Sequence, residues 1–222
     1  MTNIWHWRKK LGRSGSPVFK GRTILNMSRL ERSRLKCCMI GHAGVGKTSM
    51  CHAFMDKSVE NIQSTMGIDF WSKTIFINDS NVHLSLWDTA GAEKYDSLMH
   101  SYIRDSHIVL IVYDVSDSQQ TILKWLRVAA QYDPLVVGII GNKNDLTTTH
   151  HDFTDILTPW ERHNWTIVSA TCSSRKPSSV KKIILQCVAK ATNNKYDNNK
   201  HGACQLKYVN IQHTGRKQTC CA

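Results

Sequence analysis

The stretch 41–48 of this 222-residue chain, Gly-His-Ala-Gly-Val-Gly-Lys-Thr, has the residue types and the spacing of a site that holds phosphate groups. It fits the pattern G-x-x-x-x-G-K-[ST], in which backbone N–H groups surround the phosphates, the lysine reaches the β- and γ-phosphates, and the hydroxyl ligates Mg²⁺. A glycine-rich surface turn is the simpler alternative, so the flanking residues matter. Residues 35–40 are mostly apolar and predict a buried strand, and residues 48–56 predict a helix. The phosphates would therefore lie at a helix N-terminus.

An acidic residue follows a later predicted strand, where it could reach the same phosphates. Residues 87–91 read Trp-Asp-Thr-Ala-Gly, and Asp88 stands at the end of that strand. A carboxylate beside a phosphate-binding loop can hold Mg²⁺ through a water molecule, and the N–H of Gly91 can approach the γ-phosphate. Alone, such a stretch is more often an ordinary turn.

A second acidic residue, Asp145, belongs to the run Asn142-Lys143-Asn144-Asp145, which follows the predicted strand 135–140. Ligands bind at this edge of an open α/β sheet. A carboxylate there can accept two N–H bonds from guanine, and adenine has no such pair of donors, so Asp145 would select guanine. Ser169 and Ala170 close the last predicted strand at the same edge. An ATP-using enzyme with the same phosphate loop is the alternative that Asp145 disfavours.

Hydrophobic periodicity predicts the elements that position these residues. Strands 70–77 and 82–87, joined by a turn at 78–81, form a hairpin. Continuous apolar runs predict buried strands at 108–113 and 135–140, and a last strand covers 165–169. Helices are expected at 119–131, 152–164 (interrupted by Pro159) and 178–191. We therefore expect an α/β fold with a mostly parallel six-stranded sheet, one antiparallel edge strand and helices on both faces.

The charge of the chain lies at its ends. The formal net charge is +12, to which residues 1–36 contribute +9, residues 37–191 contribute −1 and residues 192–222 contribute +4. Basic ends suit an anionic membrane surface or nucleic acid, and solvated tails are an equal alternative. We expect a basic disordered extension at 1–34, one domain at 35–191 and a flexible tail at 192–222 that does not pack. The extension also resembles an organellar transit peptide, and Met27 offers a later start.

The eight cysteines show no metal-ligand spacing, and no secretory signal precedes them. Both observations favour reduced thiols in a cytosolic protein. The pair His150-His151 is better explained as part of a polar loop than as a pair of ligands. No apolar run reaches eighteen residues, so no membrane-spanning helix is predicted.

Taken together and in this order, the four motifs resemble those of the small GTPases over about residues 35–191. Further runs are similar to the Rab branch, namely Met66-Gly67-Ile68-Asp69-Phe70, Leu86-Trp87-Asp88 and Ser101-Tyr102-Ile103-Arg104-Asp105-Ser106. Phe54-Met55 and the run 68–74 are most similar to the Rab proteins of Golgi and retrograde transport. The resemblance implies a GTP-binding switch for vesicle transport, with Mg²⁺ and GTP or GDP as ligands.

The resemblance also implies roles for single residues. Mg²⁺ would be held by Thr48, Thr65 and Asp88. Thr65 would contact Mg²⁺ and the γ-phosphate only in the GTP state, when the two loops that respond to the nucleotide are ordered. Thr65 and Gly91 would act in hydrolysis. The nucleotide-binding set would be Gly41, Ala43, Gly44, Val45, Gly46, Lys47, Thr48, Ser49, Thr65, Gly91, Asn142, Lys143, Asp145, Ser169, Ala170 and Thr171.

The C-terminus Cys220-Cys221-Ala222 does not fit the C-a-a-X pattern, because no cysteine stands four from the end. Paired terminal cysteines resemble those of Rab proteins that receive two geranylgeranyl groups, and two lipids with nearby basic residues suffice for stable anchoring. Unmodified thiols are the alternative. The implied partners are an exchange factor, an activating protein, effectors, prenyl-delivery proteins and the cytoplasmic membrane leaflet. A monomer is expected, without nucleic acid, on the cytoplasmic face of the Golgi and in a cytosolic pool.

The sequence departs from the family at the residue after Gly91. Relatives carry a glutamine there that orients the attacking water, and this chain has Ala92, whose methyl group cannot do so. We therefore expect slow intrinsic hydrolysis. The alternative function is a GTP-locked, membrane-anchored adaptor with little turnover. Val59 stands where an aromatic residue stacks on guanine in relatives, Thr171 replaces a lysine, and Ala43 is expected to be harmless.

Overall fold

The computed structural model describes residues 33–77, 80–91, 96–117, 120–147, 153–160, 163–197 and 209–211. Predictions about the extension before residue 33, the turn residues 78 and 79, Ala92, the pair His150-His151 and Cys220-Cys221 lie outside the described residues. The strands are β1 (Ser33–Ile40), β2 (Ile68–Ile77), β3 (Ser80–Thr89), β4 (Ile108–Asp114), β5 (Val136–Asn142), β6 (Thr166–Thr171) and β7 (Val209–Ile211). The helices are α1 (Lys47–Phe54), α2 (Asp96–Ile103), α3 (Gln120–Ala130), α4 (Thr154–Leu157), the 3₁₀ turn η3 (Thr158–Trp160) and α5 (Pro177–Asp197).

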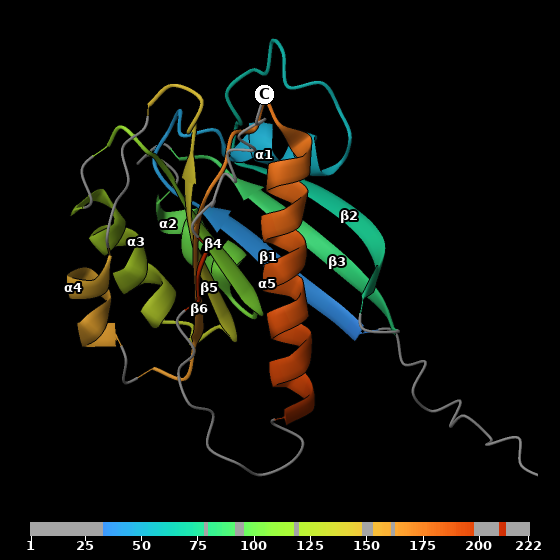
Figure 1. The fold of residues 1–222 in the computed structure, drawn as a ribbon, viewed down its shortest axis with the longest axis vertical. Coiled ribbons are helices and arrows are strands. Elements are labelled where there is room, and N and C mark those ends of the chain that lie inside the picture. The colour runs from blue at the N-terminus through green and yellow to red at the C-terminus, as the bar shows by residue number, and fades with distance from the viewer. Residues whose placement is uncertain are drawn as a thin grey trace, which may run out of the picture. The chain divides into compact units, whose positions relative to one another are not determined.

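The strands form one sheet in the order β2-β3-β1-β4-β5-β6-β7, with β2 antiparallel to β3 and every other pair parallel. Figure 1 shows the arrowheads of β1 and β3 pointing toward one end of the sheet. Parallel strands direct their carboxyl ends to a common edge, and the loops after β1, β3, β5 and β6 therefore meet there. The predicted α/β fold with a mostly parallel sheet and an antiparallel edge strand is confirmed, and β7 adds a seventh short strand.

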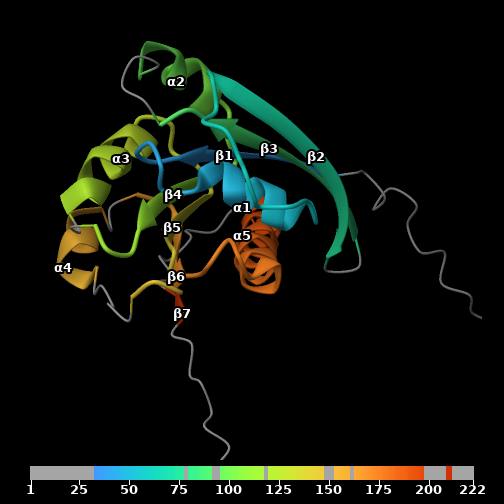
Figure 2. The same ribbon diagram turned by 90° about the horizontal axis from the view of Figure 1, so that it is seen from above.

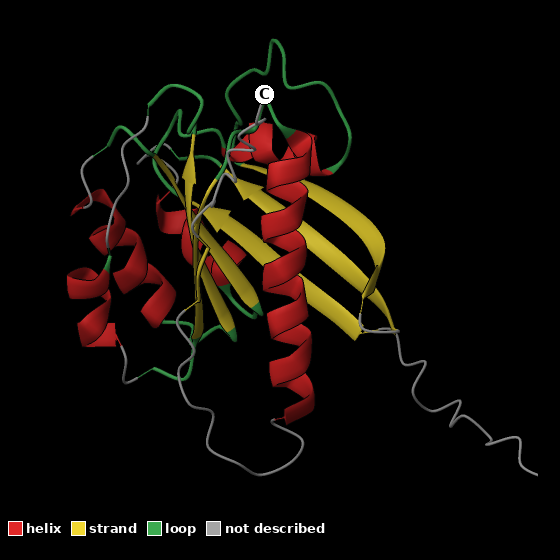
Figure 3. Ribbon diagram, viewed as in Figure 1, coloured by secondary structure: helices red, strands yellow, loops and turns green. Residues whose placement is uncertain are grey.

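Helices cover the sheet on two sides, and each side has its own buried core. Helices α1 and α5 lie on one side, and α2, α3 and α4 lie on the other (Figure 2). The first core includes Met50, Leu84 and Ile184, and the second includes Ile111 and Trp125. The secondary-structure colouring of Figure 3 shows the strands flanked by helices in this way. Strands β4 and β5 are buried on both faces, as their continuous apolar runs predict.

Three elements differ from the sequence-based expectation. Helix α2 was not predicted, although its Met99 and Ile103 are buried in the second core. The helix expected at 152–164 is one short α-helical turn followed by η3, because a proline inside a helix removes a hydrogen bond and clashes with the preceding turn.

The C-terminal region is the third. Residues from 192 onward were expected not to pack, but α5 continues to Asp197 and Val209–Ile211 pairs in parallel with β6. Thr192 is buried, and its hydroxyl donates to the carbonyl of Val188, one helical turn earlier. The helical period thus carries a polar residue onto the buried face of α5, which composition alone does not reveal.

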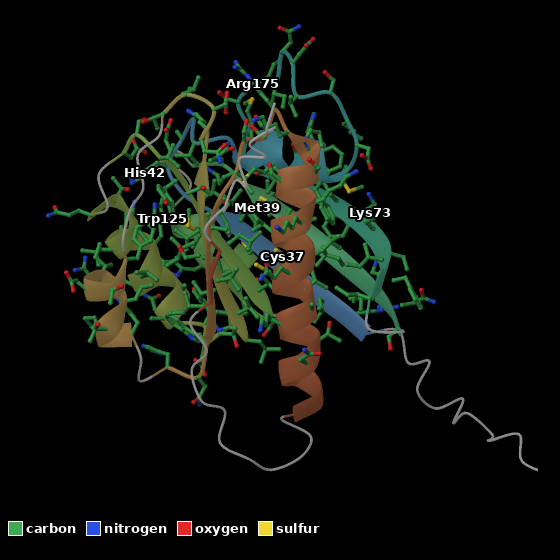
Figure 4. All side chains as sticks on the ribbon, in the orientation of Figure 1. Cys37, Met39, His42, Lys73, Trp125 and Arg175 are labelled. Carbon is green, nitrogen blue, oxygen red and sulfur yellow. The ribbon has the colours of Figure 1, made fainter. Side chains whose placement is uncertain are left out.

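The five cysteines in the described part of the chain, Cys37, Cys38, Cys51, Cys172 and Cys187, are all buried free thiols. Cys37 lies on β1 close to α5 in Figure 4. Burial raises the pKa of the Cys38, Cys172 and Cys187 thiols to about 12. It raises the pKa of the Cys37 and Cys51 thiols well above the ordinary value. These thiols pack as small apolar groups. Among the described helices, none combines the length and the hydrophobicity needed to cross a lipid bilayer.

Candidate nucleotide-binding site

The glycine-rich loop between β1 and α1 is folded around its lysine. Lys47 Nζ donates to the carbonyl oxygens of Gly41 at 2.9 Å and His42 at 2.8 Å, and the side chain is buried. Burial lowers the pKa of Lys47 to about 8, although the nearby Asp88 carboxylate acts in the opposite direction. The lysine is thus held beneath the loop at the start of α1, where a helix N-terminus favours anions.

Gly46, the residue before α1, is required by both conformation and space. Its φ of 94° lies in the left-handed region, and a Cβ there would come within 2.3 Å of Asn142 Nδ2. That amide donates to the carbonyl of Val45 at 2.9 Å, and Asn142 Oδ1 accepts the N–H of Ser174 at 2.9 Å. Asn142, which is fully buried, therefore joins the phosphate loop to the loop that follows β6.

Thr48, Thr65 and Asp88, the three residues assigned to Mg²⁺, come together although they belong to different segments. The hydroxyls of Thr48 and Thr65 share a hydrogen bond of 2.6 Å, and Thr65 Oγ1 donates to Asp88 Oδ2 at 3.3 Å. Asp88 is fully buried, and its Oδ1 hydrogen-bonds to no group in the described part of the chain. Burial raises the pKa of Asp88, while the Thr48 hydroxyl and the Lys47 ammonium lower it. Oxygen donors with an unmatched buried carboxylate oxygen fit Mg²⁺.

Thr48 and Thr65 line a cleft of about 350 Å³, a size within the range of small-molecule sites. It is lined by Ala43, Gly44, Gly46, Lys47, Thr48, Ser49, the segment Ile62–Met66 and the segment Thr89–Gly91. A Cβ on Gly91 would meet backbone atoms of His42 and Ala43 at 2.4 Å. Only glycine therefore allows the end of β3 to approach the phosphate loop this closely. Gln63, which also lines the cleft, was not predicted from the sequence.

The opposite end of the site is built around Asp145, which follows β5. Ser173 hydrogen-bonds to its carboxyl group, and Arg175 Nη1 lies 3.4 Å from Oδ2. The Ser173 hydrogen bond, together with the charges of Arg175 and Lys176, holds the pKa of Asp145 below its ordinary value. The Asp145 carboxylate is thus kept ionised and is held by Ser173 and Arg175.

Lys143 lies in the left-handed region with a φ of 65°, and its Nζ pairs with Asp114 Oδ2 at 2.7 Å. Asp114 ends β4 and also accepts hydrogen bonds from the backbone N–H and the hydroxyl of Ser116. This fixed carboxylate orients Lys143 at the same edge as Asp145. Asp114 was not among the predicted site residues.

The predicted support of Asp145 by Ser169, Ala170 and Thr171 is displaced by four residues. Those three residues lie inside β6, where they pair with β5, and Ser169 and Ala170 are buried. The contacts to Asn142 and Asp145 come instead from Ser174 and Ser173, in the loop beyond the strand. Ser173 and Ser174 could have been found from their place in the sequence, because they lie between the last strand and α5. Ligands bind in such loops, beyond the carboxyl ends of the strands.

The structure also describes two positions, Val59 and Ala43, at which the sequence differs from its relatives. Val59 is partly buried and packs against the first core, and Ala43 lines the cleft. His42 contacts the ring of Trp125 edge to face at a centroid distance of 5.4 Å, which ties the phosphate loop to α3 (Figure 4).

A comparison with known families agrees with this geometry. The sequence model of the Ras family matches residues 36–194, which include most of β1, all of β2 to β6 and most of α5.

Proposed function

This chain belongs to the Ras family of small GTPases, a family of GTP-binding switches that hydrolyse GTP, and we propose that it is a Rab-like switch regulating intracellular vesicle transport at the Golgi. The observation that carries the switch is the direct contact of Thr65 with Thr48 and Asp88. It joins a loop residue between α1 and β2 to the phosphate loop and to β3. A ligand that binds these three residues together would order that loop.

We assign the phosphates of GTP or GDP to the loop 41–49 and guanine to Asn142, Lys143 and Asp145. Mg²⁺ would be held by Thr48, Thr65 and Asp88, and when bound it neutralises phosphate charge. Lys47 places its ammonium at the phosphates, and the close approach of Gly91 brings the end of β3 to the same point. GDP titration by calorimetry, with ADP as the matched competitor, tests the assignment. Binding of ADP in preference to GDP would favour an ATP-using enzyme instead.

An exposed apolar surface next to the switch supports effector binding. Phe70 on β2 is 57% exposed and contacts Trp87 edge to face at a centroid distance of 5.5 Å, and Met66 is 85% exposed. All three belong to the runs that resemble the Rab branch. Exposed aromatic side chains next to a loop that changes order suit partners that read the nucleotide state. The Rab assignment predicts nucleotide-dependent capture of Rab effectors, and loss of capture in Phe70→Ala.

Slow hydrolysis is proposed from Ala92, which lies outside the described residues. Relatives orient the attacking water with a glutamine at this position, and an activating protein can supply its own groups. In single-turnover assays, Ala92→Gln should hydrolyse GTP at least tenfold faster than the natural chain. An ordinary small-GTPase rate for the natural chain would contradict the proposal.

Membrane attachment is proposed through geranylgeranyl groups on Cys220 and Cys221. Two lipids together with Arg216 and Lys217 meet the requirement for stable anchoring to the cytoplasmic leaflet. Prenyl-delivery proteins, an exchange factor and an activating protein would then be partners, and the protein would exchange between Golgi membranes and cytosol as a monomer. Intact mass measurement of the protein from cells tests this, since two prenyl groups should be lost in the double Cys220→Ser, Cys221→Ser variant.

The second candidate is a GTP-locked adaptor on the membrane, and Ala92 is the observation that favours it. Phosphate release over many turnovers, with and without an activating protein, separates the two functions. Turnover that rises with the activating protein supports the switch. A flat trace with bound GTP throughout supports the adaptor.

A further inference from the structure

The short strand β7 closes one edge of the sheet, and it comes from the last part of the chain. It pairs with β6 in a parallel register, in which the partners are Val168 and Val209, Ser169 and Asn210, and Ala170 and Ile211. The three β6 residues of these pairs are each 6% exposed or less. An uncovered strand edge presents unpaired N–H and C=O groups, which readily bind an extended segment. Here a segment of the chain's own tail takes that place (Figure 2).

The backbone of β6 directs one residue in particular at β7. The N–H groups of Thr166 and Cys172 donate to carbonyl oxygens on the β5 side, and the register of β5 with β6 is unbroken. Backbone N–H and C=O groups point to alternate sides along a strand, so those of Ser169 point toward β7. In a parallel pair such a residue bonds to the residues on either side of its partner, which here are Val209 and Ile211.

The connection from β6 through α5 to β7 has an unfavourable hand. The crossovers through α3 and α4 step across the sheet in the same direction, but α3 and α4 lie on the opposite face from α5 (Figure 2). The crossover through α5 therefore has the opposite hand to the other two. Because nearly all such connections are right-handed, the crossover into β7 is the left-handed one. A ladder of three residues thus holds the tail without help from a favourable crossover, and we expect it to detach and rebind.

Docking of β7 changes the place at which the end of the chain leaves the domain. Since β7 is parallel to β6, the residues after Ile211 leave at the carboxyl edge of the sheet, where the candidate nucleotide site lies. We call this edge the nucleotide edge. Helix α5 begins there and runs toward the opposite edge (Figure 1), and its 21 residues span about 31 Å. A tail released from β6 would start from that far end instead.

We propose that the outer edge of β6 is a reversible docking site for Val209–Ile211, and that docking moves the exit point of the terminal cysteines from the far end of α5 to the nucleotide edge. Cys220 lies nine residues after Ile211 but 23 residues after Asp197. The chain can therefore reach at most about 30 Å from the docked strand, against about 80 Å from the end of α5.

The consequence for the membrane rests on the lipid attachment proposed above. With lipids on Cys220 and Cys221, docking would hold the nucleotide edge close to the bilayer, and release of the tail would let the domain turn that edge toward its partners. The docking itself requires neither lipid nor nucleotide, so it is tested on the full-length, unlipidated protein.

Ile211→Pro tests the docking, because proline has no N–H to donate to Ser169. In amide hydrogen exchange followed by NMR, the protection of the Ser169 N–H should fall at least about tenfold. The N–H groups of Val168 and Ala170 point toward β5, so their protection should change less than about twofold. Gln212→Pro is the matched control, since it keeps the Ile211 N–H and favours an extended conformation at Ile211.

The control should exchange like the natural chain. Unchanged protection of Ser169 in Ile211→Pro would overturn the proposal. An equal loss in Gln212→Pro, or an equal loss at all three amides, would overturn it as well, because either result would mean a general loosening of the domain.

A distance measurement tests the change of exit point. Spin labels are attached to Cys221 and to Ser178→Cys, an exposed position in the first turn of α5, in a chain that also carries Cys204→Ser and Cys220→Ser. The cysteines of the two cores are buried and do not take up label. Ile211→Pro should increase the mean separation of the labels by about 10 Å or more, because the tail then starts at the far end of α5.

An unchanged separation would overturn the proposal even if Ser169 lost its protection. A failure of the proposed function looks different, because it would appear as missing lipids or missing guanine-nucleotide binding, with both the exchange and the distance results as expected.

Discussion

Replacement of Asn142 by alanine should damage the site more than its size suggests. Asn142 is fully buried and makes two hydrogen bonds of 2.9 Å, one to the carbonyl of Val45 and one from the N–H of Ser174. Asn142→Ala leaves both backbone groups without this partner. An unsatisfied buried group costs about 1–3 kcal/mol. The Ser174 bond is only partly buried, so its loss belongs at the low end of that range.

The two losses together predict a fall of about 2–4 kcal/mol in the free energy of unfolding. Urea denaturation without nucleotide measures this fall as a shift of the midpoint at constant slope. Because Asn142 joins the phosphate loop to the base-binding loop, GDP release should also accelerate. Release is measured by displacement of fluorescent GDP.

Thr192→Val is the control for the loss of a buried side-chain hydrogen bond elsewhere. The Thr192 hydroxyl donates to the carbonyl of Val188 within α5, far along the helix from the loops of the site. Because valine has nearly the same shape, this variant should lower the free energy of unfolding by about 1 kcal/mol or less and leave GDP release unchanged. If Asn142→Ala lost less than about 1 kcal/mol and released GDP at the natural rate, the reasoning about two stranded backbone groups would be refuted.

Three further predictions concern the base, the phosphates and the core. Ser173→Ala removes the hydrogen bond that most lowers the pKa of Asp145, so the carboxylate should take up its proton at a higher pH. In a titration from pH 7.5 to 4.5, the variant should therefore lose its preference for GDP over ADP at a higher pH than the natural chain. Equal pH profiles would contradict this. Gly91→Ala places a methyl group 2.4 Å from backbone atoms of the phosphate loop, so binding of a GTP analogue should weaken at least tenfold while GDP binding changes less; equal losses for both nucleotides would argue against the close approach. Leu84→Ala, at a fully buried position, should lower the free energy of unfolding by about 3–5 kcal/mol in urea, and a loss below 1 kcal/mol would mean that the first core refills the cavity.

The sheet could be predicted from sequence because its signals are local. Continuous apolar runs mark β4 and β5, and the glycine loop between an apolar strand and a helix places α1. Helix α2 has no comparable signal, since its boundaries depend on the packing of Met99 and Ile103 against residues distant in sequence. The pairing of β7 with β6 is also a tertiary contact that no local pattern specifies.

The site divides in the same way. Lys47, Thr48, Asp88 and Asp145 follow motifs with fixed spacing, and the structure places them at one edge of the sheet. The supporting serines were assigned four residues too early because Ser169-Ala170 matches a familiar pair of residue types, whereas the contact is decided by where β6 ends. Asp114 carries no motif, and only the fold brings it to Lys143.

The buried thiols make the opening of this fold measurable by chemistry. A thiolate is the reactive form of cysteine, and Cys37, Cys38, Cys51, Cys172 and Cys187 are both enclosed and held as thiols. In a variant with serine at positions 204, 220 and 221, alkylation would occur only when the core opens. The rate at which an alkylating reagent consumes the protein would then report the opening equilibrium, and the order in which the sulfurs react would show which layer separates first.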